Sequence, residues 1–220
     1  MASLKRAGWG LPAFALAVSL AACASAPPPA AGAPDAAAPA AAPALAATAP
    51  PLRLAGLRLL VLPFQAISGL PGDADERLGR ELLFALGERE PRATLVAPDV
   101  LERALRRSPG FAADPRALPG DPLVHHRVRQ AVEPLAGELR RYAALTDVRL
   151  ILLPRSAAFS RPAGAAEGRV RIDAAIIDAR SGDVVWWGEA EGDPRPEADA
   201  RAIGSAAAAL AARMAAAGAR

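Results

Sequence analysis

The stretch from residue 24 to residue 51 consists almost entirely of alanine and proline, and it limits how much of the chain can fold. Asp35 is its only charged residue, and its small side chains offer almost no bulky apolar surface to bury and no periodic polarity. We therefore expect residues 23–52 to form a disordered linker. Residues 53–220 remain for folding, and about 165 residues are enough for one domain with its own core.

The composition of the linker also sets its reach. Proline-rich segments favour the polyproline II helix, which rises ~3.1 Å per residue, so about 28 residues would extend over roughly 80–90 Å. Two interpretations stay open: a spacer whose length is not selected, and a tether tuned to pass through a polymer mesh.

The residues before the linker have the layout of a secretory signal peptide. Lys5 and Arg6 form a basic start, and the apolar run over residues 11–20 is too short to remain as a membrane span. The run leads into Leu20-Ala21-Ala22-Cys23, which resembles the bacterial lipobox. We therefore predict that residues 1–22 are a lipoprotein signal peptide, which signal peptidase recognises through Leu20, Ala21 and Ala22.

Cys23 would then be the acylated first residue of the mature chain, attached to a membrane through its lipid. The alternative is that Cys23 is an ordinary small residue near an alanine-rich cleavage site. Ala24 follows it in place of an aspartate, which by resemblance to other lipoproteins favours the outer membrane over the inner one. Because Cys23 is the only cysteine, its acylation leaves no thiol for a disulfide or a cysteine-based metal site.

The balance of charge argues against a nucleic-acid partner. Of the 26 basic residues, Lys5 and Arg6 would leave with the signal, and the remaining 24 face 23 acidic residues. The arginines are interleaved with aspartate and glutamate and do not gather in a basic stripe. We therefore expect the folded domain to bind neither nucleic acid nor an anionic lipid surface.

The periodicity of residues 53–220 predicts strands and helices in alternation. Short apolar or alternating runs predict strands over residues 57–64, 94–97, 148–153, 169–178 and 183–187. Apolar positions at helical spacing predict helices over residues 73–86, 98–107, 124–142 and 197–217. The order β-α-β-α-α-β-β-β-α predicts an α+β (mixed α/β) domain with one mixed sheet, covered by helices mainly on one side.

Four residues are expected to set helix boundaries. Asp73 and Asp99 each precede a glutamate by three residues, which is the spacing of a capping box. Gly87 is expected to end the first helix. Pro134 is expected to kink or break the third, because proline lacks a backbone donor and clashes with the preceding turn.

Motifs for catalysis are missing from the sequence: it contains no hydrolase nucleophile motif, phosphate loop, dinucleotide glycine pattern or zinc-protease motif. The only histidines, His125 and His126, are neighbours, so on a helix they would point about 100° apart and would not easily share a metal. Asp173 and Asp178 offer a carboxylate pair, although an exposed strand face explains them as well. We therefore predict no catalytic residue, no cofactor and no metal.

Trp186 and Trp187 are adjacent in a predicted strand, so their side chains are expected to point to opposite faces of the sheet. Core packing of both is one interpretation. The other is that one of them is exposed and contacts a partner protein.

Several motifs, taken in order, resemble a known family. They are the strand Leu60-Val61-Leu62-Pro63-Phe64, the step from Thr94-Leu95-Val96 into Asp99-Val100-Leu101, the strand Leu150-Ile151-Leu152-Leu153 and the hairpin Asp178-Ala179-Arg180-Ser181-Gly182-Asp183-Val184-Val185-Trp186. Their order behind a lipobox resembles the periplasmic αβ domain shared by the amino-terminal part of TolB, the penicillin-binding-protein activator LpoB and the curli secretion lipoprotein CsgG. The similarity covers most of residues 57–217.

The resemblance implies a binding or assembly protein and not an enzyme. An LpoB-like protein would be an outer-membrane lipoprotein whose domain crosses the peptidoglycan on its linker, binds a cell-envelope protein and activates peptidoglycan synthesis. A CsgG-like protein would be a subunit of an outer-membrane secretion or transport complex, although no pair of ~10-residue alternating strands with aromatic girdles is evident. No contact residue of these families has a motif to match here, so none is carried over.

Overall fold

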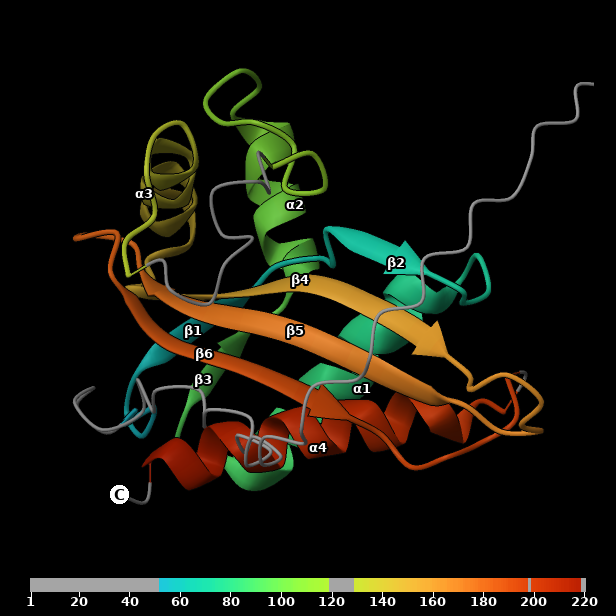
Figure 1. Ribbon diagram of the computed structural model, residues 1–220. Helices are drawn as coiled ribbons and strands as arrows, with labels where there is room; N and C mark the ends of the chain where they lie inside the picture. Colours follow the sequence, from blue (N-terminus) through green and yellow to red (C-terminus); the bar gives the residue numbers. More distant parts are fainter. Residues whose placement is uncertain (1–51, 119–128, 198, 219–220) are drawn as a thin grey trace, which may run out of the picture. The chain divides into compact units, whose positions relative to one another are not determined.

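The computed structural model describes residues 52–118, 129–197 and 199–218. The strands in this part of the chain are β1 (Arg58–Val61), β2 (Ala66–Ser68), β3 (Thr94–Val96), β4 (Leu150–Ser160), β5 (Arg169–Asp178) and β6 (Val184–Glu191). The helices are α1 (Ala74–Arg89), α2 (Pro98–Arg107), α3 (Leu135–Thr146) and α4 (Arg201–Gly218), as Figure 1 shows. The predicted α/β fold class is confirmed.

All the strands belong to one mixed sheet, whose main path runs β3-β1-β4-β5-β6. β1 lies parallel to β3 on one side and to β4 on the other, and β5 lies antiparallel to both β4 and β6. The sequence analysis does not predict the short strand β2, which pairs with β4 beyond the end of β1. The main path therefore ends at two edge strands, β3 with 3 residues and β6 with 8.

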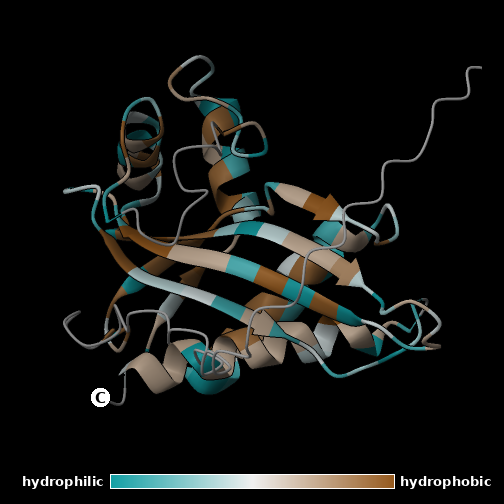
Figure 2. Cartoon of the chain, viewed as in Figure 1, coloured by the Kyte–Doolittle hydropathy of each residue, from teal (hydrophilic) through white to brown (hydrophobic). Residues whose placement is uncertain are grey.

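Helices cover both faces of the sheet. α1 and α4 pack on the face to which Leu59, Val61 and Leu152 point. α2 and α3 pack on the opposite face, over Leu60, Leu62, Ile151 and Leu153. The expectation that helices lie mainly on one side is therefore wrong, because β1 and the start of β4 are apolar on both sides and each side needs a cover. Figure 2 shows this hydrophobic start of β4 and the hydrophilic residues in its middle.

One of the four predicted helix boundaries is wrong, and neither of the two predicted capping boxes forms. Asp73 takes the N-cap position of α1 but makes no side-chain capping bond. Asp99 is the second residue of α2, behind Pro98, so neither capping box forms. Gly87 lies inside α1, which continues to Arg89 because the helix tolerates an isolated glycine. The break at Pro134 is confirmed, since α3 begins directly after it. The part of the predicted helix before Pro134 is wrong over residues 129–133, which form no helix, and residues 124–128 lie outside the described residues.

Two strands are longer than predicted. β4 continues from the apolar run through Pro154 to Ser160, and β6 continues past the tryptophans to Glu191. The strand predicted over residues 169–178 is confirmed as β5. The long pairings of β5 with β4 and with β6 explain the extensions, because a neighbouring strand supplies backbone partners that the local sequence does not indicate.

Candidate functional site

The two tryptophans of β6 lie on opposite faces of the sheet, as the strand pattern predicts. Trp186 is 9% exposed and belongs to the core cluster beneath α1 and α4. Its ring lies so close to Gly188 that a Cβ there would come within 2.2 Å of a ring carbon. Trp187 is half-buried on the opposite face. Of the pair, therefore, only Trp187 is placed to touch another molecule.

A bulge in β4 places Arg155 beside Trp187. The register between β4 and β5 shifts between Pro154 and Ser156, so Arg155 is the extra residue. Its guanidinium carbon lies 4.9 Å from the centre of the Trp187 ring, which is within cation–π distance. Burial lowers the pKa of Arg155, and the negative charge of Asp173 acts against that shift. An arginine guanidinium is effectively always protonated in proteins, so Arg155 carries its charge at neutral pH.

Polar side chains surround this pair on β4, β5 and β6. The Ser156 hydroxyl donates to an Asp173 carboxylate oxygen at 2.9 Å, and Arg171 forms an ion pair with Glu189. We call this set of residues the open sheet surface: Arg155, Ser156, Arg171, Asp173, Trp187 and Glu189. Among the described helices, α2 and α3 lie over the end of this face where β4 begins and β5 ends, and none lies over the open sheet surface (Figure 1).

Asp173 and Asp178, the carboxylates that the sequence offers as a pair, do not come together. Asp173 and Asp178 lie on opposite faces of β5, because their separation in the strand is an odd number of residues. Asp173 bonds to Ser156 on the open sheet surface, whereas Asp178 is 5% exposed and accepts a hydrogen bond from Arg149 at 2.7 Å. Both carboxylates thus have structural partners.

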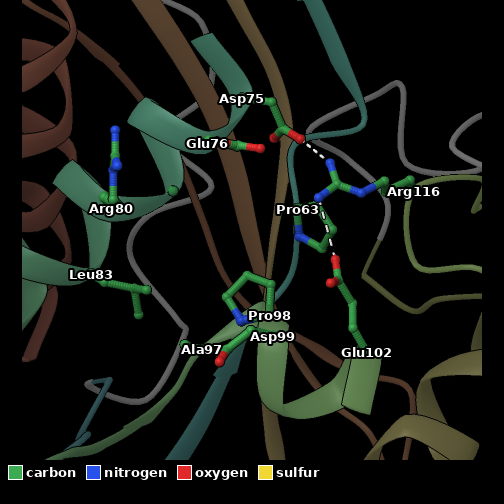
Figure 3. Close-up of a pocket in the computed structure, with 11 residues that line it drawn as sticks. Pro63, Asp75, Glu76, Arg80, Leu83, Ala97, Pro98, Asp99, Glu102 and Arg116 are labelled. Atoms are coloured by element: carbon green, nitrogen blue, oxygen red, sulfur yellow. Dashed lines mark hydrogen bonds and ion pairs between the residues drawn. The ribbon is translucent and has the colours of Figure 1, made fainter. Parts of the chain in front are cut away.

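A crevice between the beginnings of α1 and α2 is the second candidate (Figure 3). Its cavity of about 320 Å³ lies where β1 and β3 end, and its lining is Pro63, Asp75, Glu76, Gly79, Arg80, Leu83, Ala97, Pro98, Asp99, Glu102 and Arg116. In open α/β sheets ligands often bind beyond the carboxyl ends of the strands. The position of the crevice is therefore a reason to examine its charges.

Arg116 lies in the lining of that crevice and links the two helices that form its walls. The guanidinium bonds to Asp75 on α1 and, at 3.3 Å, to Glu102 on α2. Burial acts to lower the pKa of Arg116, but the hydrogen bonds and charges of Asp75 and Glu102 outweigh it and raise the pKa. Asp99 pairs with Arg103 along α2. Most charges of the crevice are thus matched within the chain, which fits a structural clasp better than a ligand site.

The described ranges contain neither a cluster of metal ligands nor a membrane-spanning helix. No three histidine, cysteine, aspartate or glutamate side chains there are arranged to hold a metal ion. Every helix in these ranges is too short or too polar to span a bilayer. Leu20, Ala21, Ala22 and Cys23 lie outside the described residues, as do His125 and His126, so what the sequence predicts for them stays a prediction.

Sequence reasoning names Trp187 but misses Arg155 and Arg116. An arginine directly after Pro154, in a run otherwise apolar or small, is the one local signal for Arg155. Its approach to Trp187 depends on the bulge and on the pairing of β5 with two neighbours, which involve residues far apart in the sequence. Arg116 meets Asp75 across 41 residues, a contact that no local pattern indicates.

Among the comparisons with known proteins, only the one with solved structures finds similar chains. No protein-family model matches the sequence, and no curated protein sequence matches it either. The chain is similar in structure to a dodecameric PelC variant from Paraburkholderia phytofirmans, with 14% sequence identity and a TM-score of 0.43 over 76% of this chain and 94% of PelC.

Two further solved structures are similar. One is the carboxy-terminal domain of LpoB from Salmonella enterica, with 16% identity and a TM-score of 0.40 over 63% of this chain and 84% of that one. The other is lipoprotein GNA1162 from Neisseria meningitidis, with 15% identity and a TM-score of 0.41 over 65% and 84%. LpoB, which the sequence motifs indicate, is thus among the structures that this chain resembles.

Proposed function

We propose that the chain is a non-enzymatic outer-membrane lipoprotein, anchored at the periplasmic face through a lipid on Cys23, whose folded domain binds a cell-envelope protein. The lipobox-like Leu20-Ala21-Ala22-Cys23 and the alanine- and proline-rich linker support the anchor. The observation that carries the binding role is the Arg155–Trp187 pair on the open sheet surface. Tryptophan and arginine are enriched among the residues that dominate protein–protein binding energies.

Within that class, we favour an LpoB-like activator of peptidoglycan synthesis. The linker supports this choice, because an extension of roughly 80–90 Å would carry the domain far from the membrane that holds the lipid. A CsgG-like subunit of a secretion or transport complex is the second candidate, and β3, the edge strand at the other end of the sheet from β6, favours it by offering a route to assembly. The native mass of the detergent-extracted protein separates the two: an activator is expected as one copy, and a ring as many.

The anchor is tested by a Cys23→Ser variant. Without the thiol no lipid can be attached, so we expect the protein to leave the membrane fraction as unprocessed or soluble chain. Two or more acyl chains give durable attachment, each buried CH₂ contributing ~0.8 kcal/mol. A Cys23→Ser protein that still fractionates with membranes through its intact domain would show that the lipid is not the anchor.

The partner is tested by chemical cross-linking of the lipidated protein in intact cells of its own organism. Capture of a peptidoglycan synthase by a monomeric protein would support the activator. Capture of copies of the chain together with an exported substrate would replace the activator with the secretion subunit. Capture of no envelope protein at all would refute the binding role.

A further inference from the structure

The outer edge of β6 presents backbone groups that the sheet does not use. Gly192 N donates to Val170 O at 2.9 Å, and the register pairs Glu191 with Arg171. Residues of an antiparallel strand alternate in the direction of their backbone bonds. From Trp186 to Ala190 the even-numbered residues of β6 therefore bond to β5, and Trp187, Glu189 and Glu191 turn their N–H and C=O groups outward. Before the bulge the Val184 N–H points to the outer side and already donates to Arg129 O at 2.8 Å. Within the described ranges no hydrogen bond uses the outward groups of Trp187, Glu189 and Glu191.

The side chains of the same three residues share one face of the sheet. Trp187, Glu189 and Glu191 pair across to Ala175, Asp173 and Arg171, the residues of β5 that alternate on the side of the open sheet surface. Free backbone groups and recognisable side chains thus coincide on these three residues. An incoming strand would meet an aromatic ring and then two carboxylates, at every second position; the carboxylate of Glu189 is also ion-paired with Arg171 of β5.

We propose that the edge of β6 receives an extended segment of the partner protein as an additional strand, with arginine or lysine at the alternate positions opposite Glu189 and Glu191. This inference rests on the proposed function and names the site and the chemistry of its partner. Strand addition derives affinity from main-chain hydrogen bonds and specificity from alternate side chains. Opposite charges directly across two strands favour the pairing.

A second copy of this chain fits the edge poorly. If two β6 strands paired edge to edge in antiparallel fashion, Glu189 and Glu191 of both copies would gather on the same face, and like charges across a ladder destabilise it. Acidic edges of this kind prevent self-association. The same carboxylates attract a cationic strand, so one feature rejects the copy and selects the partner.

The chain's own linker is also a poor occupant. Residues 24–51 contain no lysine or arginine, so they offer no charge for Glu189 or Glu191. Their many prolines lack the N–H groups that strand pairing requires.

The bulge of β6 lies at Val185, before Trp187, Glu189 and Glu191, so the stretch that would pair with an added strand remains regular.

The test measures binding of two labelled decapeptides to the detergent-solubilised full-length lipoprotein by fluorescence anisotropy. One peptide alternates arginine with threonine, and the other alternates glutamate with threonine. We expect the arginine peptide to bind at least tenfold more tightly than the glutamate peptide. Equal affinity for the two would overturn the proposal.

Variants separate backbone pairing from charge. Glu189→Pro removes one outward N–H and no bond to β5, and proline is tolerated where the N–H of an edge strand faces solvent; we expect at least a tenfold loss of arginine-peptide affinity. Combined Glu189→Gln and Glu191→Gln should weaken it about threefold to tenfold, by losing two cross-strand charge pairs. Glu88→Gln, an exposed position on α1, is the matched control and should change nothing.

Circular dichroism checks the fold of each variant. If Glu189→Pro does not fold, the combined glutamine variant alone tests the proposal. Unchanged affinity in folded Glu189→Pro, or in the glutamine pair, overturns the proposal. So does a dimer in sedimentation that Glu189→Pro abolishes, because the occupant is then a second copy. If wild type and Glu189→Pro cross-link an envelope protein equally in cells, the edge of β6 is not the binding site, but the proposed function still holds. If neither protein cross-links an envelope protein, the proposed function is refuted.

Discussion

Tyr142 is the residue whose ionisation can be isolated most cleanly in this chain. Its side chain is buried on α3, and its hydroxyl donates to Ala113 O at 2.8 Å. Burial raises the pKa of Tyr142, and the negative charges of Glu138 and Asp114 add to the shift. It is the only tyrosine, and the only lysine, Lys5, lies in the predicted signal. Once the signal is removed and Cys23 acylated, no other side chain of the chain titrates near pH 10.

The stability of the mature protein should therefore fall at alkaline pH because of Tyr142 alone. Its folded pKa lies above the unfolded value of about 10, so its stabilising contribution is complete below pH ~10 and is lost as the pH rises toward the folded pKa. Urea unfolding between pH ~8 and ~11.5 should show this decline in wild type and a nearly flat profile in Tyr142→Phe. At neutral pH that variant should lose about 1 kcal/mol with its hydrogen bond. Parallel alkaline declines in the two proteins would contradict the assignment.

The two tryptophans should differ in their effect on stability. Trp186→Ala opens a cavity in the core beneath α4 and is expected to lower the free energy of unfolding by about 3–5 kcal/mol. Trp187→Ala removes a half-buried ring and its contact with Arg155, and about 1–2 kcal/mol is expected. Urea unfolding of the two variants measures the difference. A larger loss of stability for Trp187→Ala than for Trp186→Ala would contradict the assignment of Trp186 to the core.

At the scale of elements, the attachment of α4 to the sheet depends on a close approach at Gly192. A Cβ at this position would lie 2.5 Å from Ser205 Oγ and 2.8 Å from Ala206 N, both on α4. The helix backbone contributes one of these contacts, so side-chain rotation cannot relieve it. The absence of a side chain at Gly192 thus allows α4 to lie directly against the residue that follows β6.

Gly192→Ala should accordingly lower the free energy of unfolding by about 1–3 kcal/mol, because the added methyl group displaces α4. Gly87 provides the matched control: it lies inside α1, and a Cβ there would meet nothing within 4 Å. Gly87→Ala should raise stability by about 0.5–1 kcal/mol, since alanine favours the helix. Chemical denaturation of both variants measures the two signs. Equal effects would show that α4 does not constrain Gly192.

Elements with a strong local signal are predictable from the sequence, and elements that depend on distant partners are not. The apolar run of β1, the alternation of β5 and the break at Pro134 each follow from neighbouring residues. β2 forms because it pairs with the second half of β4 across about 90 residues, and that half of β4 is itself held by its pairing with β5. The candidate site divides in the same way, since Trp187 is visible in the strand pattern, whereas its contact with Arg155 depends on a bulge.

At the scale of the whole molecule, the proposal joins an anchor, a linker and a domain that presents one exposed recognition surface. In that proposal the linker keeps the domain distant from the lipid proposed on Cys23, so the partner need not lie in the anchoring membrane. The domain gives that partner the open sheet surface together with the edge of β6, which meet at Trp187 and Glu189. The binding role therefore predicts contact at this surface and not on the outer side of α1.

Site-specific photo-cross-linking in intact cells tests that role most directly. A photoreactive amino acid replaces Trp187 in one version of the lipidated protein and Glu88 on α1 in the other, and the captured proteins are identified by mass spectrometry. We expect an envelope protein to be captured from position 187 and not from position 88. Capture from position 88 alone, or of nothing but copies of this chain from position 187, would contradict a domain that binds its partner through the open sheet surface.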